Sequence, residues 1–271
     1  MRIFVQNNLR KVAELAYQFV KSAIVDKGSK VLGFASGSTM LDLYAELASG
    51  CRRGDLDFSD VSTFNVGEYL GLPPDHPQSC RFFMEANLFG HLNLKSSNIH
   101  FLDGLTDSVE DECAYYEQDM EALGGVKLQL LGLGRNGHLG FNEPGTPMES
   151  RSHYATLTEE TREDNRRFFP AKVDVPRWAL TMGTGTILDA QELLLIATGQ
   201  EKAIAVRDMV EGPVSASCPA SFLQVHPNAN VILDEAAASL LARKSYWNAS
   251  ADDYNDMMDY LMAARRKAGL E

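Results

Sequence analysis

Cysteine and tryptophan are scarce in this chain, and no long uninterrupted apolar run occurs. The four cysteines are scattered, without the close spacing of metal-binding or redox motifs, so they are most simply free thiols in a reducing compartment. Neither a signal peptide nor a run long enough to cross a bilayer is present. We therefore expect a cytoplasmic protein with no membrane partner.

Positive charge is also in short supply. Lysine and arginine total 25 against 37 aspartates and glutamates, which gives a net charge of −12. A surface field of this sign argues against nucleic acid and anionic membrane as partners. A few basic residues that converge locally could still bind a small phosphorylated metabolite, so the charge leaves that class of ligand open.

Apolar residues make up 45% of the 271 residues, which is enough for a sizeable core. Strand-like runs alternate with helical periodicity along the chain, as is typical of an α/β fold with a doubly wound, mostly parallel sheet and helices on both faces. Without an internal repeat or a linker, residues 1–271 are predicted to form a single domain. The segment at about 150–175 is charged and weakly periodic, and we interpret it as a lid or a partly exposed helix over the site.

The predicted elements follow from hydrophobic periodicity and from turn residues. Strands are predicted at 2–5, 30–35, 61–66, 99–102, 128–133, 179–182, 193–198 and 231–233. Helices are predicted at 8–25, 40–47, 78–89 and 109–123, from 199 onward, and over most of the chain from 236 to the end. A glycine turn is predicted at 183–186 and a small-residue loop at 214–221.

The chain is organised around residues 128–145, where a mostly apolar strand leads into glycines, a histidine, two amides and a carboxylate. From Gly132 the glycines have the G-x-G-x-x-G spacing of a dinucleotide-binding loop. That motif requires a helix directly afterwards, and further glycines and a proline follow too soon for one to form. We therefore interpret the segment as an active-site loop that carries His138 and Glu143 at the carboxyl edge of a sheet.

A second polar turn, Ser36-Gly37-Ser38-Thr39, lies between a predicted strand and a helix. Such a turn can direct backbone N–H groups at an anion, or it can simply contain a helix N-cap, and the residues favour the two interpretations equally. It has neither the G-K-[ST] ending of a phosphate-binding P-loop nor the pattern of a nucleophile elbow. Lys202 in the first turn of a later helix opposes the helix dipole, which hints at a bound anion.

These motifs resemble those of the glucosamine-6-phosphate deaminases, a family within the superfamily that also contains 6-phosphogluconolactonase. The resemblance extends over nearly the whole chain, through Gly33-Phe-Ala-Ser-Gly-Ser-Thr39, Phe64-Asn-Val-Gly-Glu-Tyr-Leu-Gly-Leu72, Gly134-Arg-Asn-Gly-His-Leu-Gly-Phe-Asn-Glu-Pro144, Ala179-Leu-Thr-Met-Gly183 with Ile187-Leu-Asp189, and Ala197-Thr-Gly-Gln-Glu-Lys202. The Gly-His-x-x-Phe-Asn-Glu-Pro form is specific to the deaminase branch. The Asp-Gly-His-Thr-Ala-Ser continuation usual in the lactonases is missing.

The resemblance implies conversion of glucosamine 6-phosphate and water to fructose 6-phosphate and ammonia, without a metal or other cofactor. His138 would open the sugar ring by moving a proton between the ring oxygen and the anomeric hydroxyl, which suits the near-neutral pKa of an imidazole. Glu143 would be its carboxylate partner. Asn136 stands where many members have an aspartate, and it would orient the imidazole with less charge stabilisation. The partner is a small-molecule sugar phosphate, and the chain could be a monomer or a homo-oligomer.

The resemblance also implies where the substrate phosphate binds. It would lie on the turn from Ser36 to Thr39, with Arg167 from the lid and Lys202 supplying positive charge. Each charge-assisted hydrogen bond contributes on the order of 1.5–3 kcal/mol. A bound phosphate would then explain both the polar turn and the position of Lys202 in the first turn of a helix.

Position 67 departs from the family pattern Phe-Asn-x-Asp-Glu-Tyr, whose aspartate moves a proton between C2 and C1 of the open-chain sugar. Gly67 cannot do this. Glu68 is the nearest carboxylate and a candidate catalytic residue, but adjacent residues on an extended chain face opposite sides. Glu68 could replace the aspartate only if the glycine lets the chain turn. Because a general base contributes about 10²- to 10⁴-fold, we predict an intact fold and phosphate site with impaired isomerisation.

Two alternatives remain open from the sequence. One is a deaminase or isomerase of another amino-sugar phosphate, such as galactosamine 6-phosphate, because the phosphate site says little about the sugar hydroxyls. The other is a weakly catalytic sugar-phosphate binding protein, for which Gly67 is the main reason. A 6-phosphogluconolactonase is less favoured.

Overall fold

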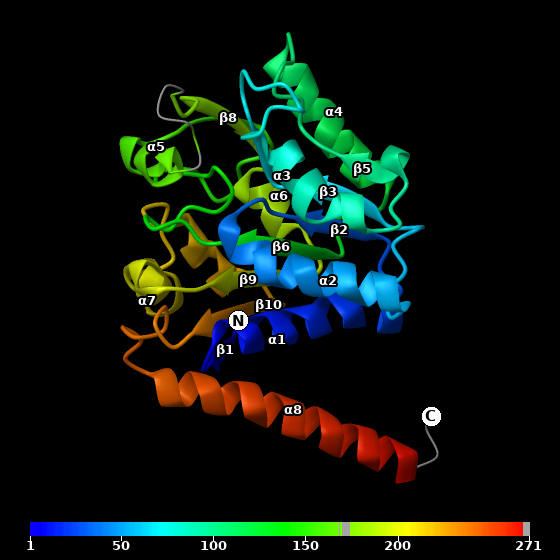
Figure 1. Ribbon diagram of the computed structural model, residues 1–271. Coiled ribbons are helices and arrows are strands. Elements are labelled where there is room, and N and C mark those ends of the chain that lie inside the picture. The colour runs from blue at the N-terminus through cyan, green and yellow to red at the C-terminus, as the bar shows by residue number, and fades with distance from the viewer. Residues whose placement is uncertain (168, 170–173, 268–271) are drawn as a thin grey trace.

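Two sheets form the framework of the protein. The computed structural model describes residues 1–167, 169 and 174–267 (Figure 1). A seven-stranded sheet has the order β1-β10-β9-β6-β2-β3-β5, and a three-stranded sheet has the order β4-β8-β7. All pairings in the large sheet are parallel, and those in the small sheet are antiparallel. The strands are β1 (Arg2–Gln6), β2 (Val31–Phe34), β3 (Ser62–Asn65), β4 (Gly67–Tyr69), β5 (Ile99–His100), β6 (Leu128–Gly132), β7 (His153–Thr156), β8 (Trp178–Thr181), β9 (Leu193–Ala197) and β10 (Ala229–Asp234).

Helices cover both faces of the large sheet. The α-helices of the described chain are α1 (Leu9–Lys21), α2 (Leu41–Arg53), α3 (Cys80–Asn87), α4 (Val109–Ala122), α5 (Glu159–Arg166), α6 (Thr184–Leu188), α7 (Ala203–Glu211) and α8 (Lys244–Lys267). Because parallel crossovers are right-handed, connections that run in opposite directions along the sheet place their helices on opposite faces. Accordingly α1, α2 and α3 cover one face, with α1 and α2 side by side in Figure 1, and α4, α6 and α7 cover the other. In the described chain no helix is both long and apolar enough to traverse a bilayer.

The strands of the large sheet are buried on both faces, which explains their nearly continuous apolar sequences. Leu193, Leu194 and Leu195 of β9, for example, are completely inaccessible to solvent. Gln129 is a polar exception in β6. Its side chain lies over Gly33 of the neighbouring strand β2, where an added Cβ would come within 1.8 Å of Gln129 Oε1. A glycine in β2 therefore provides the space for the buried amide of β6.

The order of the strands fixes where polar loops can meet. From β2 the chain crosses to β3 on one side, and β6 is followed in the sheet by β9 on the other side. The crevice between the carboxyl ends of β2 and β6 is thus the point where the winding direction reverses, and such crevices are the usual ligand sites of open α/β sheets. The loops after β2, β6 and β9 all open there.

The predicted doubly wound α/β fold is confirmed. The strand predicted at 179–182 is also confirmed as β8, and it pairs antiparallel in the small sheet. Two other local predictions were wrong. The glycine turn predicted at 183–186 is largely the start of α6, since its glycines fit a short helix. The last helix begins at Lys244, after a series of turns from residue 235.

The segment at about 150–175, predicted to be a lid or a partly exposed helix, contains a strand and a helix among its described residues. Strand β7 opens it and pairs with β8, and helix α5 follows. Residues 168 and 170–173 of this segment lie outside the described residues. In Figure 1 α5 and the small sheet lie above the main sheet, on the side away from α8.

Candidate active site

A cavity of about 390 Å³ lies in the crevice at the carboxyl ends of β2, β6 and β9. Polar groups from four separate segments line it. They are Ser36, Gly37, Ser38 and Thr39 after β2, His138 and Arg135 after β6, Thr161, Asp164, Asn165 and Arg167 in and after α5, and Thr198, Glu201 and Lys202 after β9. The structure therefore brings the predicted phosphate-binding residues and His138 into one cavity.

The turns after β2 and β9 have the same construction. Gly37 has φ +145° and ψ 152° and precedes the 3-10 helix η2 (Ser38–Met40). Gly199 has φ +93° and ψ 148° and precedes the 3-10 helix η5 (Gln200–Lys202). Positive φ with an extended ψ is nearly restricted to glycine, which explains glycine at both positions. Each turn starts a short helix at the cavity wall, so that backbone N–H groups and a helix end lie beside the cavity.

Glycines after β6 provide the position of His138. An added Cβ on Gly134 would lie 2.2 Å from His138 Nδ1, so the imidazole lies directly over the backbone of that residue. Gly137 has φ +85° and closes the turn through its N–H, which donates to the Gly134 carbonyl over 3.1 Å. Throughout the described loop from 133 to 150 no helix forms. The glycines that have dinucleotide-motif spacing therefore serve to place a histidine.

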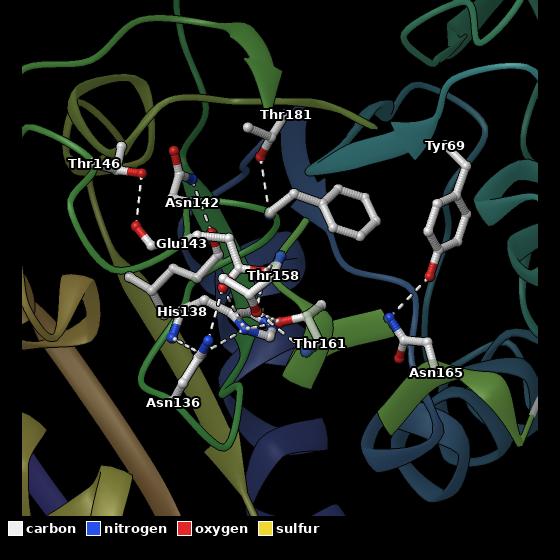
Figure 2. A network of polar contacts seen from close by, with 12 residues as sticks. Tyr69, Asn136, His138, Asn142, Glu143, Thr146, Thr158, Thr161, Asn165 and Thr181 are labelled. Carbon is white, nitrogen blue, oxygen red and sulfur yellow. Dashed lines mark hydrogen bonds and ion pairs between the residues drawn. The ribbon is translucent and has the colours of Figure 1, made fainter. Parts of the chain in front are cut away.

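Asn142 fixes the far end of the same loop. Its side-chain amide donates 2.8 Å hydrogen bonds to the carbonyls of Leu139 and of Met182, which follows β8 (Figure 2). It is completely buried. The asparagine in the Phe-Asn-Glu-Pro motif thus joins the loop to the small sheet, while the next residue, Glu143, reaches the histidine.

His138, Asn136 and Glu143 form a hydrogen-bonded cluster (Figure 2). Asn136 Nδ2 donates to Glu143 Oε2 over 2.7 Å, and Asn136 Oδ1 accepts from the His138 backbone N–H over 3.2 Å and from ring Nδ1 over 2.8 Å. Glu143 Oε2 lies 3.8 Å from His138 Nδ1. Because the amide oxygen faces Nδ1, this nitrogen carries the hydrogen, and Nε2 of the neutral ring is left as a proton acceptor.

Burial lowers the pKa of His138, and the Glu143 carboxylate opposes that shift by favouring the imidazolium. The Lys202 ammonium lowers the pKa further and Asp164 raises it. A lowered pKa keeps the imidazole neutral near pH 7, so that Nε2 can accept a proton. The nearby carboxylate stabilises the imidazolium that this transfer forms.

Charged side chains also line the cavity. Arg135, Arg167 and Lys202 line it together with the carboxylates of Asp164 and Glu201. Arg135 Nη1 donates to Asp164 Oδ1 over 2.6 Å and so joins the central loop to α5. Burial lowers the pKa of Lys202, and the neighbouring cations Arg167 and Arg135 contribute in the same direction against Glu201 and Asp164. An ammonium in such surroundings is stabilised by any anion that enters the cavity.

Helix α5 is attached to the rest of the site at both ends. Its N-cap residue Thr158 donates to Glu143 Oε1 through its backbone N–H (3.1 Å) and its hydroxyl (3.2 Å). Near its other end, Asn165 Nδ2 donates to the Tyr69 hydroxyl over 3.0 Å (Figure 2). Tyr69, Phe141 and Phe169 also line a smaller, mainly apolar cavity of about 180 Å³ that shares His138 with the first.

Gly67 and Glu68 lie outside the residues that line either of these cavities. The Glu68 carboxylate is buried and accepts three backbone N–H bonds of 2.8 Å, from Tyr69 and Cys80 to Oε1 and from Arg81 to Oε2. Two of these donors are in the first turn of α3. Burial raises the pKa of Glu68 against the effect of these bonds. Glu68 therefore holds the N-terminus of α3, and it does not line the cavity.

A larger cavity of about 560 Å³ lies between α4 and α6 and shares no residue with the site. Arg151 borders it, but its guanidinium is already paired with Glu117 and with Asp189, each at 2.5 Å. The cavity therefore offers no converging polar groups comparable to those around His138.

Several residues of the site were not expected from the sequence. Arg135, Thr158, Thr161, Asp164 and Asn165 were not predicted, although four of them line the cavity and Thr158 contacts Glu143. For Arg135 a signal was present, because it lies between two predicted loop glycines. The polar residues of α5 look like an ordinary exposed helix face, and only its position over the cavity shows which side chains point inward.

Known proteins resemble this chain over most of its length. The family model described as glucosamine-6-phosphate isomerases/6-phosphogluconolactonase matches residues 6–233. The chain is 44% identical over 241 residues to the glucosamine-6-phosphate deaminase of Thermoanaerobacter pseudethanolicus, covering 89% of this chain and 95% of that protein. It is 47% identical over 247 residues to the deaminase of Hahella chejuensis, covering 91% and 94%.

Solved structures give a consistent result. A structure described as a monomeric glucosamine-6-phosphate deaminase superposes with a TM-score of 0.86 at 41% identity, covering 89% of this chain and all of that one. The 6-phosphogluconolactonase of Trypanosoma brucei superposes with a TM-score of 0.73 at 19% identity, covering 89% and 98%. At that identity the second likeness shows a shared fold alone.

Proposed function

This chain belongs to the family of glucosamine-6-phosphate isomerases and 6-phosphogluconolactonases, and from that premise we propose that it converts glucosamine 6-phosphate and water to fructose 6-phosphate and ammonia. It is an enzyme of the deaminase and isomerase type, as its close relatives are. The observation that carries the proposed reaction is the single cavity that joins His138 to the cationic group of Arg167 and Lys202.

Ring opening is the step for which the site is best equipped. The substrate enters as a pyranose, and His138 Nε2 takes the proton of the anomeric hydroxyl and returns it to the ring oxygen as the C1–O5 bond breaks. Nδ1 stays bonded to Asn136, which fixes the tautomer during this transfer. The Glu143 carboxylate, 3.8 Å from Nδ1, stabilises the transient imidazolium.

Isomerisation follows in the open chain. The proton on C2 is removed and a proton is added to C1, while the aldehyde oxygen gains a proton and the amine nitrogen loses one. The aldehyde and amine thereby become an alcohol and an imine. Water then adds to the imine carbon, and ammonia leaves to give the ketose. Gly67 supplies no group for the C2–C1 transfer, so we expect this step to limit turnover.

Phosphate binding would use the polar turn and the cations of the cavity wall. The turn from Ser36 to Thr39 presents backbone N–H groups and hydroxyls, while Lys202 and Arg167 provide charge. This arrangement fits a phosphate bound in the same cavity as His138. The groups that bind the phosphate do not distinguish between sugar hydroxyls, so galactosamine 6-phosphate must be tested as a substrate beside glucosamine 6-phosphate.

Ammonia release from glucosamine 6-phosphate tests the proposal directly. The purified chain and a His138→Asn variant are compared on glucosamine 6-phosphate, galactosamine 6-phosphate and 6-phosphogluconolactone. We expect turnover of the first compound, reduced by about 10²- to 10⁴-fold in the variant. Lactone hydrolysis without ammonia release would refute the proposed reaction.

Gly67 favours a second candidate function, a sugar-phosphate binding protein with slow turnover. It differs from the first in one measurable property. A binding protein would hold glucosamine 6-phosphate tightly in calorimetry while ammonia release stays at the level of the His138→Asn variant.

A further inference from the structure

Thr158 lies where the lid segment meets the acid–base cluster. It is the N-cap of α5, and its side-chain oxygen accepts from the Thr161 backbone N–H over 3.2 Å. The same hydroxyl lies 3.2 Å from Glu143 Oε1, to which the Thr158 backbone N–H also donates. One residue therefore starts the helix and holds one oxygen of the carboxylate.

The two oxygens of Glu143 have different partners. Oε2 accepts from Asn136, which bonds His138 Nδ1, and Oε1 accepts from Thr158. With both oxygens held, the plane of the carboxylate is fixed relative to the imidazole. The single hydroxyl hydrogen of Thr158 also has Thr161 Oγ1 within 3.1 Å, but an ionised carboxylate is the stronger acceptor.

Thr161 completes a closed group of contacts. Its hydroxyl lies 3.4 Å from His138 Nδ1, and its side chain is almost fully buried while still lining the cavity. Helix α5 also carries Asp164 and leads to Arg167, both in the cavity wall. The position of the N-cap thus affects the carboxylate beside His138 and the placement of the lid residues at the same time.

We propose that Thr158 is a positioning residue, which orients Glu143 for its action on His138 and couples that orientation to the position of the lid helix. The kinetic part of its test rests on the proposed deaminase reaction, whereas titration of His138 does not. Besides Glu143, the charged groups that act on His138 are Lys202 and Asp164, and Thr158 contacts neither in the described structure.

Three substitutions separate capping from positioning. Thr158→Ser keeps both the cap and the donated hydroxyl. Thr158→Asp keeps a strong helix cap and the backbone N–H donor, but its side chain cannot donate to Glu143 and adds a like charge beside it. Thr158→Val removes cap and hydroxyl together. Ser108→Ala is the matched control, because Ser108 caps α4 with its side chain and lies outside the residues that line the site cavities.

We expect Thr158→Ser to keep kcat within about 3-fold, and Thr158→Asp to lose about 10-fold or more in kcat with its melting temperature preserved. Ser108→Ala should lose thermal stability with parental kcat. Parental kcat in Thr158→Asp would reduce the role of the residue to capping and overturn the proposal.

Titration of His138 by nuclear magnetic resonance gives a readout that needs no turnover. A loosened Glu143 stabilises the imidazolium less, so the titration midpoint should fall in Thr158→Val and stay parental in Thr158→Ser and Ser108→Ala. An unchanged midpoint in Thr158→Val would also overturn the proposal. If the parent releases no ammonia, the proposed function fails while this titration still decides the role of Thr158.

Discussion

Phe141 occupies the space that a side chain on Gly67 would enter. A Cβ built on Gly67 would lie 2.8 Å from Phe141 Cδ2 and 2.7 Å from the Leu180 carbonyl oxygen of the paired strand β8. Gly67 is not among the glycines with positive φ, so the obstacle to a larger residue is steric. The absence of a side chain at position 67 is therefore what allows β4, β8 and the Phe141 ring to pack this closely.

Gly67→Asp should restore a proton-transfer group at the expense of stability. Overpacking costs about 1–3 kcal/mol in typical cores, and we expect a loss of that size in both Gly67→Asp and the control Gly67→Ala. Ammonia release should rise at least about 10-fold in Gly67→Asp relative to Gly67→Ala. Adding Phe141→Leu should recover part of the stability. Equal turnover of the two variants would show that the absent carboxylate does not limit the reaction.

Glu68 should prove structural. Glu68→Ala leaves three backbone N–H groups without their acceptor, two of them at the start of α3, and should lower the free energy of unfolding by about 2–4 kcal/mol. Glu68→Gln keeps one acceptor oxygen and should lose less. Denaturant unfolding measures both effects, and kcat of the folded Glu68→Gln variant should stay within about 3-fold. A 100-fold loss of kcat with parental stability would instead identify Glu68 as the proton-transfer group.

Asn136→Asp should raise the pKa of His138. The substitution puts a carboxylate at the place of the amide whose oxygen lies 2.8 Å from Nδ1, and a nearby negative charge favours the imidazolium. Burial now lowers that pKa, so the added charge acts in the opposite direction. The limb of the kcat/KM profile that reports His138 should move to higher pH. Asn136→Ala is the control, with lower kcat and no upward movement of the limb.

Lys202→Gln should weaken substrate binding more than catalysis. Loss of one charge-assisted hydrogen bond to phosphate predicts a KM about 10- to 100-fold higher with kcat nearly unchanged, and Lys202→Arg should retain part of the affinity. Inhibition by inorganic phosphate should weaken in parallel. A parental inhibition constant for phosphate in Lys202→Gln would exclude Lys202 from the phosphate site.

The affinity of phosphate for the parent protein should depend on the protonation of Lys202. Burial lowers the pKa of the free lysine, and a bound phosphate raises it again by stabilising the ammonium. The complex therefore keeps a proton on Lys202 at pH values at which the free protein has already lost it. The affinity for phosphate should fall as the pH rises through the pKa of Lys202 in the free protein. Calorimetry in buffers of different ionisation enthalpy should show proton uptake on binding, and this uptake should disappear in Lys202→Gln.

Features encoded in short stretches were predictable. An apolar strand followed by glycines and a histidine determines its own conformation, because positive φ at Gly137 and the absence of a side chain at Gly134 act over a few residues. The turn at Ser36–Thr39 is local in the same sense. Alternating strands and helices also restrict the topology to a few arrangements, so the doubly wound fold could be predicted.

The sequence by itself thus determined the large parallel sheet, the loop of His138 and Glu143, and the polar turns that face them. Only the tertiary structure decided that β4, β8 and β7 form a second sheet, that Phe141 fills the space beside Gly67, and that Glu68 anchors α3. It also brought Thr158 into hydrogen-bonding distance of Glu143, and Arg135 into hydrogen-bonding distance of Asp164. Each of these contacts joins segments far apart in the chain or depends on which helix face turns inward, and no local periodicity carries that information.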